Sequence, residues 1–214
     1  MLEVMCMRKI TGLYHEFLTN VPGMANWHFD YDVNLFDNQS KAEPYAKKLV
    51  LFHAKTKEIF TVYEASEQQV ISNVATPEFD GEKLYFLVLD QAEKQILFMS
   101  YRLSTQEVIE EMQISSEHAP FARLQIYGFP VLLAEEDFDN EQLEIYYPKR
   151  FSLPLLEQES FECQEGEHYY FSKWLADETL PRRNAYLVKN AKGQVVEEGI
   201  GRIMRFANSE FMIV

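Results

Sequence analysis

The chain of 214 residues has only two cysteines, Cys6 and Cys163, and neither lies in a Cys-x-x-Cys motif or beside a histidine. Two isolated thiols do not make the disulfide framework of small secreted domains. A secretory signal would place basic residues ahead of an apolar run, whereas here Glu3 comes early and no such run follows Arg8-Lys9. These features predict a cytoplasmic protein whose thiols are reduced.

Long hydrophobic runs and basic clusters are also missing. A membrane-spanning helix needs about 18 consecutive apolar residues, but Leu124–Ala134, one of the longest uncharged stretches, has 11 residues and a Gly-Phe-Pro break. The 20 Lys and Arg residues face 34 Asp and Glu residues, which gives a net charge of −14. Phosphate groups are bound by clustered Lys and Arg. We therefore expect neither a nucleic acid nor a membrane as partner.

Motifs that carry catalysis are absent as well. The sequence has no Gly-x-Ser-x-Gly elbow and no glycine-rich phosphate loop, and its five histidines show no metal-ligand spacing. We predict no catalytic residue, no metal site and no cofactor. The acidic run Glu135–Glu141 would offer carboxylate oxygens to Ca²⁺, but it lacks the glycine and the final glutamate of an EF-hand. A solvated hairpin turn is the interpretation that we favour there.

What the sequence does contain is a large supply of apolar residues, 47% of the chain, with 16 Phe and 12 Tyr, enough to bury a core. Several short segments are rich in β-branched and aromatic residues and are bounded by turn residues, as strands are. The clearest are Lys83–Asp90, Gln95–Tyr101 and Glu107–Ile114. A strand over Asn73–Phe79 would join the first of these through the Asp80-Gly81 turn. Four successive strands are therefore predicted.

The same group of four strands recurs along the chain. Third strands are predicted to begin near residues 48, 95, 143 and 185, and fourth strands near residues 59, 108, 151 and 195. Second strands are predicted over 32–36, 83–90, 129–135 and 168–175. A period of about 40–45 residues with four strands per unit resembles the blade of a β-propeller. The likeness is to the architecture alone, because no Trp-Asp dipeptide, kelch glycine pair or Asp-box of a named propeller family is present.

This resemblance implies an all-β, small propeller-like fold with about five four-stranded blades in a single domain over residues 1–214. The expected units are 20–66, 67–115, 116–160 and 161–202, with 203–214 and 1–19 together closing the ring and hiding its strand edges. The alternative is an α+β fold with a large antiparallel sheet. It rests on a capping box at Ser104–Glu107 and on Pro44 near the start of a helix over Glu43–Lys48.

One segment combines aromatic rings with carboxylates, the residue types that bind sugars. We predict ligand binding by Trp27, His28, Asp30 and Asp32, because rings stack on sugars, acids accept hydroxyl protons, and paired carboxylates cleave glycosidic bonds. First strands line the channel of a propeller, which would bring such groups to the centre of the ring. A half-buried strand produces the same alternation of residue types. The aromatic cluster His168–Trp174 is interpreted as the core and rim of one strand.

Two functions follow from this sequence. The absence of catalytic motifs in a repeat architecture favours a non-enzymatic module that binds a protein partner, and that function predicts an exposed apolar and aromatic patch. The alternative is a carbohydrate-binding or glycoside-hydrolase-like protein. It predicts carboxylates from different blades converging beside an exposed ring.

Overall fold

The computed structural model describes residues 11–15, 18–32, 45–128, 130–177, 180–205 and 211–214. Within these ranges the regular secondary structure consists of β-strands alone, which confirms the all-β class. The α+β alternative is wrong at Ser104–Glu107, where residues 104–106 form a turn and Glu107 begins a strand. Gln106 there has a φ of 59°, whereas a helix needs about −63°. Of the second proposed helix, residues 43 and 44 lie outside the described residues, and Lys48 begins a strand.

Five antiparallel sheets contain all the strands of the described ranges, and four of these sheets have the four-strand order of a propeller blade. The first contains β1 (Thr19–Asn20), β2 (Trp27–Tyr31), β3 (Lys48–His53) and β4 (Glu58–Glu64). The second contains β5 (Gln69–Ile71), β7 (Lys83–Asp90), β8 (Gln95–Arg102) and β9 (Glu107–Ser115), with β6 (Glu78–Phe79) also paired to β7.

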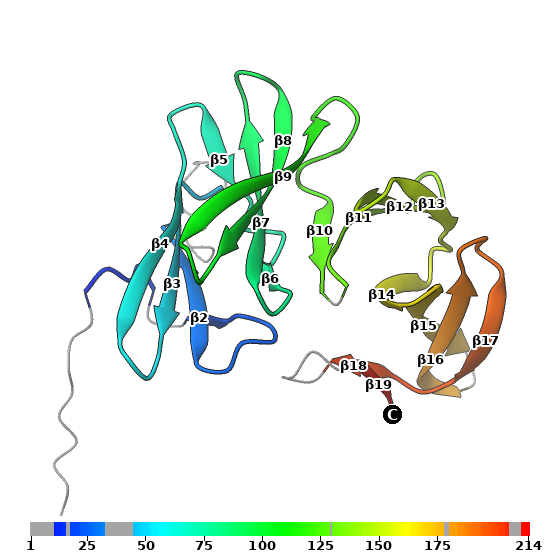
Figure 1. The fold of residues 1–214 in the computed structure, drawn as a ribbon. Coiled ribbons are helices and arrows are strands. Elements are labelled where there is room, and N and C mark those ends of the chain that lie inside the picture. Colours follow the sequence, from blue (N-terminus) through cyan, green and yellow to red (C-terminus); the bar gives the residue numbers. More distant parts are fainter. Residues whose placement is uncertain (1–10, 16–17, 33–44, 129, 178–179, 206–210) are drawn as a thin grey trace, which may run out of the picture.

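The third sheet contains β10 (Leu124–Tyr127), β11 (Leu132–Asp137), β12 (Gln142–Tyr147) and β13 (Phe151–Pro154). The fourth contains β14 (Glu159–Glu165), β15 (His168–Asp177), β16 (Leu180–Asn190) and β17 (Val195–Ile200). The fifth pairs β18 (Ile203–Arg205) with β19 (Phe211–Ile213). In the third and fourth sheets, the first strands β10 and β14 lie towards the middle of the molecule and the last strands β13 and β17 lie outside (Figure 1).

Successive sheets are held together by apolar side chains that alternate along their strands. On β7, Leu84, Phe86 and Val88 pack towards the first sheet, whereas Tyr85 and Leu87 pack towards the third. A third cluster joins the third and fourth sheets. Because successive side chains of a strand point to opposite faces, a sheet between two neighbours needs apolar residues at every position. This explains the unbroken apolar run that made β7 the clearest strand in the sequence.

Three predicted strands need correction. The second strand of the first sheet is Trp27–Tyr31 rather than 32–36, of which residues 33–36 lie outside the described residues. The second strand of the third sheet begins at Leu132, not at residue 129. The predicted strand Asn73–Phe79 is broken, because β5 and β6 pair with β7 separately. Between them the hydroxyl of Ser72 accepts the backbone N–H of Ala75, which closes a turn instead of continuing the strand.

The strands β18 and β19 pair with each other, as a first and second strand of a fifth blade would. At the other end, β1 pairs with β2, and the backbone N–H groups of Tyr14 and His15 donate to the side chain of Asp30 on β2, which holds these two residues against the first sheet. Residues 1–10 lie outside the described residues, and closure of the ring by both termini stays a prediction. No helix in the described parts of the chain is long and apolar enough to cross a membrane.

Candidate functional site

The two aromatic residues of the predicted ligand site lie on β2 and pack against its neighbours. The ring of Trp27 is half-buried, with its centre 4.7 Å from that of His53 and 5.6 Å from that of Phe60. The ring of His28 lies 6.1 Å from that of Phe52. Its Nδ1 atom is buried and has no hydrogen-bond partner among the described residues. Both rings therefore contribute to the packing of the first sheet.

The two carboxylates of that site hold backbone segments in place. Asp30 is 4% exposed, and its oxygens accept hydrogen bonds from the backbone N–H groups of Tyr14, His15 and Tyr31. Its Oδ1 also lies 2.5 Å from His15 Nδ1. Asp32 accepts the backbone N–H groups of residues 47 and 48, at 2.8 and 3.0 Å. Ligand binding by Trp27, His28, Asp30 and Asp32 stays a prediction.

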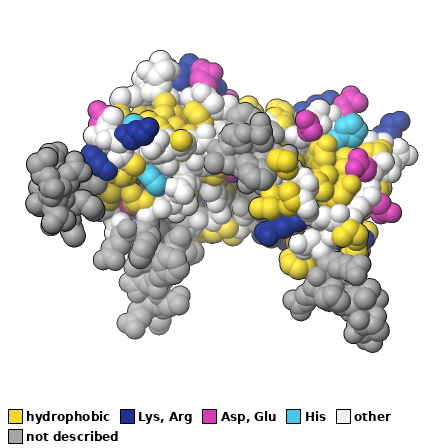
Figure 2. All heavy atoms as spheres, turned by 90° about the horizontal axis from the view of Figure 1, so that it is seen from below, with side chains coloured by type: hydrophobic (Ala, Val, Ile, Leu, Met, Phe, Trp, Pro, Cys, Tyr) yellow, Lys and Arg dark blue, Asp and Glu magenta, His cyan; other side chains and the backbone are white. Residues whose placement is uncertain are grey.

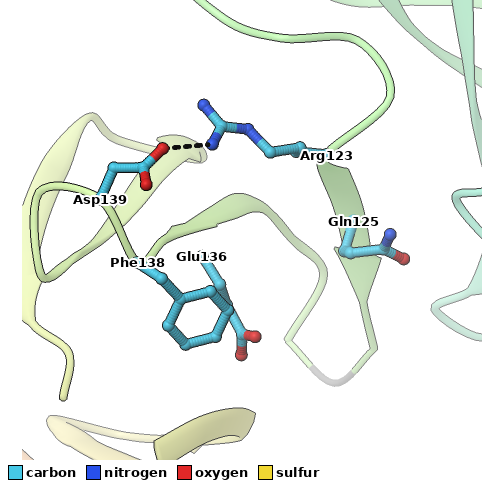
Figure 3. A pocket seen from close by; sticks show the side chains of 5 residues that line it. All are labelled: Arg123, Gln125, Glu136, Phe138 and Asp139. Carbon is cyan, nitrogen blue, oxygen red and sulfur yellow. Dashed lines mark ion pairs between the residues drawn. The ribbon is translucent and has the colours of Figure 1, made fainter. Parts of the chain in front are cut away.

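A second group of polar residues surrounds Arg123, which directly precedes β10. Two hollows lie against it. The smaller, of about 360 Å³, is lined by Arg123, Gln125, Glu136, Phe138 and Asp139. Figure 3 shows the guanidinium of Arg123 beside the carboxylate of Asp139, 3.5 Å away, while the Glu136 side chain and the Phe138 ring lie together, away from that pair. Glu136 and Gln125 come from neighbouring strands, and Phe138 and Asp139 come from the turn between β11 and β12.

The acid of the smaller hollow, Glu136, joins two sheets. Glu136 Oε1 accepts the backbone N–H of Phe161 at 2.5 Å and the hydroxyl of Ser160 at 3.0 Å, both on β14. Burial raises the pKa of the Glu136 carboxyl, although these hydrogen bonds lower it. The oxygens of Glu136 are thus engaged in joining the third sheet to the fourth.

The larger hollow, of about 590 Å³, lies between the segment before β10 and the β11–β12 hairpin. Glu135, which is 3% exposed, is its most buried acid. Its Oε1 forms an ion pair with Arg123 Nη2 at 2.8 Å, and its Oε2 accepts the hydroxyl of Tyr146 at 3.2 Å. The guanidinium of Arg150 lies 5.4 Å from the centre of the Tyr146 ring. The remaining lining residues are Ser116, Glu117, His118, Ala119, Pro120, Asp137, Asn140, Gln142 and Glu144.

Electrostatics distinguish the acids of this larger hollow. Burial raises the pKa of Glu135, and the negative charges of Asp137 and Glu144 raise it further, against the opposing effects of Arg123 and Tyr146. The pKa of Asp137 is lowered, chiefly by its hydrogen bond from the Asn140 side chain at 2.7 Å. A carboxyl with a raised pKa thus lies two residues from one with a lowered pKa, on the same face of β11.

The acidic run Glu135–Glu141, predicted to be a hairpin turn, is partly strand. Glu135, Glu136 and Asp137 end β11, and only the residues between Asp137 and Gln142 form the turn. Alternation along β11 sends Glu136 to the face opposite Glu135. Among the described residues, no group of three or more His, Cys, Asp or Glu side chains is placed to hold a metal ion. Arg123 and Tyr146 were not predicted, because their roles depend on contacts between different strands, which leave no local signal in the sequence.

The raised pKa of Glu135 predicts a specific dependence of stability on pH. The folded protein binds this proton more tightly than the unfolded chain, so stability falls as pH rises from the ordinary glutamate pKa, about 4.3, through the raised folded value. In Glu135→Gln this contribution is absent. We expect the stability of the wild type relative to this variant to decrease over that window, measured from urea unfolding curves at a series of pH values.

Tyr146→Phe serves as the second variant, since it removes a hydrogen bond that lowers the pKa of Glu135. We expect it to move the upper end of the pH window to higher pH. A difference between the wild type and Glu135→Gln that does not change with pH, or that grows as pH rises, would contradict the assignment.

Exposed apolar side chains gather on the fourth and fifth sheets. Of the 14 large hydrophobic side chains that are exposed among the described residues, nine lie between residues 174 and 214. We call them the 174–214 surface: Trp174, Leu175, Val195, Val196, Ile200, Met204, Met212, Ile213 and Val214. Figure 2 shows apolar side chains on the right half of the molecule, which holds β11 to β19, and further ones on the left half.

Comparisons with known proteins give no family. Neither a family model nor a curated protein matches the sequence. Among solved structures, the chain is similar to one in the crystal structure of a mitotic checkpoint complex, with 9% identity and a TM-score of 0.46, covering 93% of this chain and 59% of that one. It is also similar to an exo-β-1,3-galactanase from Phanerochaete chrysosporium, crystallised with β-1,3-galactotriose, with 8% identity and a TM-score of 0.41, covering 85% and 50%. The chain thus spans between half and three fifths of the length of these proteins.

Proposed function

We propose that the protein is a non-enzymatic module that binds a protein partner through the 174–214 surface. The observation that carries this proposal is the concentration of nine exposed large hydrophobic side chains on the fourth and fifth sheets. Single exposed apolar residues are normal on any protein, but a group of them on neighbouring strands is typical of a protein-binding site.

The backbone brings part of this surface together at the junction of the two sheets. The N–H of Gly201 donates to the carbonyl of Asn184 at 3.0 Å, and Arg202 and Val214 exchange two backbone hydrogen bonds of 2.8 and 2.9 Å. Trp174 pairs with Asn184 across β15 and β16. Residues 174, 200 and 212–214 therefore lie on adjoining backbone segments. The side chains of Trp174 and Ile200 lie on opposite faces of the fourth sheet, because they pair with the successive residues Asn184 and Ala185 of β16. Charged Glu197 and Glu198 on β17 are exposed beside them, as in the polar rim of an interface.

The edge of the fourth sheet adds a second mode of contact. Among the described strands β17 pairs only with β16, and five of its six residues are exposed. An edge strand with free backbone groups can accept an extended segment of a partner.

Carbohydrate binding through Trp27, His28, Asp30 and Asp32 is the weaker alternative, because the carboxylates of Asp30 and Asp32 already accept backbone hydrogen bonds.

Charge placed in the 174–214 surface tests this function. Trp174→Glu and Ile200→Glu alter side chains that are 58% and 63% exposed, so we expect both variants to fold as the wild type does. The wild type is used to capture partners from the lysate of its source, and the captured proteins are identified by mass spectrometry. We expect at least one protein to be captured by the wild type and lost from Trp174→Glu or from Ile200→Glu, according to the face of the fourth sheet that the protein contacts.

The matched control is Val108→Glu, which adds the same charge at a side chain that is 41% exposed on β9, outside the surface. It is expected to keep the partner. Capture of the same proteins by all four forms would contradict the proposal. Light scattering of each form shows in parallel whether the wild type alone self-associates, in which case the partner is a second copy of the chain.

A further inference from the structure

The outer edge of β17 is a strand edge at the margin of the molecule (Figure 1). β17 is the last strand of the fourth sheet, and among the described residues its backbone forms hydrogen bonds with β16 alone. The side chains of Val195, Val196 and Ile200 on this strand are 51%, 52% and 63% exposed. An unpaired edge of this kind is a template on which a further strand can form.

The register of β17 determines which of its backbone groups face outward. The N–H of Gly201, directly after the strand, donates to a carbonyl of β16 at 3.0 Å. Successive residues of an antiparallel strand direct their N–H and C=O groups to opposite sides, and the pairing of residues 197–200 with β16 has no register shift. Gly199 and Glu197 therefore bond towards β16, whereas Ile200 and Glu198 present their N–H and C=O groups to the free edge.

The side chains beside these groups give the edge a definite chemistry. Glu198 and Ile200 lie two residues apart and share one face of the sheet. The carboxylate of Glu198 forms no hydrogen bond or ion pair with the other described residues, whereas that of Glu197, on the opposite face, accepts the hydroxyl of Tyr186 at 2.8 Å. β17 contains no Lys, Arg or His. An incoming strand thus meets a carboxylate without a counter-ion next to an apolar side chain.

The position of the two acids argues against a second copy of the chain as the occupant. Glu197 and Glu198 are the two middle residues of β17. When two copies of this strand pair antiparallel in full register, Glu197 of each copy lies opposite Glu198 of the other. Like charges directly opposite on neighbouring strands are destabilising, whereas opposite charges stabilise the pair. The net charge of −14 adds further repulsion between copies. The edge therefore favours a basic strand over its own copy.

We propose that the free edge of β17 binds an extended basic segment of a protein partner, which pairs its backbone with Glu198 and Ile200 and places a lysine or arginine opposite Glu198. An apolar residue two positions away on that segment lies opposite Ile200. Backbone hydrogen bonds supply the affinity, and the pair of opposite charges selects the partner. The inference rests on the proposed protein-binding function and names the kind of partner that this part of the 174–214 surface accepts.

A short strand-forming peptide tests the proposal. The probe is acetyl-Thr-Val-Thr-Lys-Thr-Val-Thr-amide, whose order of residues is the same in both directions, so that parallel and antiparallel pairing both place a valine two residues from the lysine. In the control peptide a glutamate replaces the lysine. Binding is followed by NMR shifts of the backbone amides at low salt. We expect the lysine probe to bind with a Kd on the order of 1 mM, and the glutamate peptide to bind about fivefold more weakly or less.

Amide hydrogen exchange shows whether the probe occupies the edge. At a probe concentration of about five times the Kd, the N–H groups of Glu198 and Ile200 are expected to exchange about sixfold more slowly, because only about one sixth of the edges remain free. The N–H groups of Glu197 and Gly199 already bond to β16, and their exchange is expected to change by less than about twofold.

Reversal of the charge at the edge tests the selection of the partner. Glu198→Lys is expected to weaken binding of the lysine probe about fivefold and to reverse the preference, so that the glutamate peptide binds more tightly. Glu58→Lys is the matched control, because it makes the same substitution at an exposed residue of β4, the last strand of the first sheet. It is expected to keep the preference for the lysine probe.

A proline at the edge tests the backbone pairing. Glu198→Pro removes an N–H that faces away from β16, and proline is tolerated at such positions of edge strands. Its far-UV circular dichroism spectrum is expected to match that of the wild type, and it is expected to bind neither peptide. Dissociation by Glu198→Pro of a dimer that the wild type forms would assign the edge to a second copy and overturn the proposal.

Three further results would overturn it. They are the absence of shifts at lysine-probe concentrations up to about 10 mM, equal binding of the two peptides to the wild type, and equal effects of Glu198→Lys and Glu58→Lys. The proposed function is judged separately by partner capture. A captured protein that is lost from Trp174→Glu or Ile200→Glu, together with a probe that does not bind, would refute pairing at the edge and leave the protein-binding function in place.

Discussion

Lys189→Met is expected to lower the free energy of unfolding by about 3–5 kcal/mol. Lys189 on β16 and Glu159 on β14 are each only 3% exposed, and Lys189 Nζ lies 2.6 Å from Glu159 Oε2. The ammonium also donates to the carbonyl of Pro154 at 2.7 Å and lies 4.4 Å from the centre of the Phe171 ring. Without it, a carboxylate and a carbonyl remain buried with no cation.

The loss arises from the charge left behind rather than from the pair itself. Removing one partner of a buried ion pair is costly, whereas replacing both partners with neutral groups is often harmless. Glu159 Oε2 also accepts the backbone N–H of Leu156 at 3.0 Å, and a glutamine oxygen can do the same. The double variant Lys189→Met/Glu159→Gln is therefore expected to recover more than half of the lost stability.

Urea unfolding at neutral pH measures these differences. Lys192→Met is the matched control, because the same substitution is made three residues away at an exposed position, where we expect a change below about 0.5 kcal/mol. A loss below about 1 kcal/mol in Lys189→Met, or a double variant less stable than the single one, would show that the carboxylate finds another partner or that the lysine acts through its packing alone.

Lys189 also takes part in one of two polar links between the third and fourth sheets. Lys189 of the fourth sheet binds the carbonyl of Pro154, at the end of the third sheet, and Glu136 of the third sheet binds the backbone N–H of Phe161 in the fourth. Between these polar links lies the apolar cluster that contains Leu143, Phe171 and others. The two sheets are thus joined by an apolar centre with buried charged groups near its margin, which restricts how one sheet can slide over the other.

Most strands were predictable because each sheet between two neighbours is apolar on both faces. The predicted strand over 83–90 coincides with β7, and third strands were predicted at 48 and 95, where β3 and β8 begin. The failure at β2 has a physical cause. Asp30 occupies a buried position there only because the backbone of Tyr14 and His15 satisfies its carboxylate, and a contact across 15 residues leaves no local signal.

The contacts of Glu135 were not predictable for a related reason. In the sequence, Glu135 and Glu136 belong to one acidic run, and nothing indicates that β11 places them in different hollows. Arg123 and Tyr146 reach Glu135 from positions 12 and 11 residues away, through the pairing of β11 with β10 and β12. Composition indicated the surplus of acid, but only the register of the strands shows which acids and bases come together.

The second large effect is expected in the core between the second and third sheets. Phe98 on β8 is fully buried, and its ring centre lies 5.4 Å from that of Tyr85 and 5.0 Å from that of Tyr147. Tyr147 belongs to the third sheet, so this ring contact crosses between sheets. Truncation of a buried phenylalanine costs about 3–5 kcal/mol, from lost burial and from the cavity left behind. Phe98→Ala is expected to fall in this range.

Phe98→Leu is expected to cost less than Phe98→Ala, because it retains most of the buried carbon and leaves a smaller cavity. Val108→Ala, at a side chain that is 41% exposed in the same sheet, is the control and is expected to change stability by less than about 0.5 kcal/mol.

Urea unfolding is followed by tyrosine and tryptophan fluorescence and by far-UV circular dichroism. Because clusters of side chains join successive sheets from the first to the fourth, both probes should report one transition in every variant. Two separate transitions in Phe98→Ala would show that the first two sheets unfold independently of the next two, and a loss below about 1.5 kcal/mol would show that the neighbouring rings close the cavity.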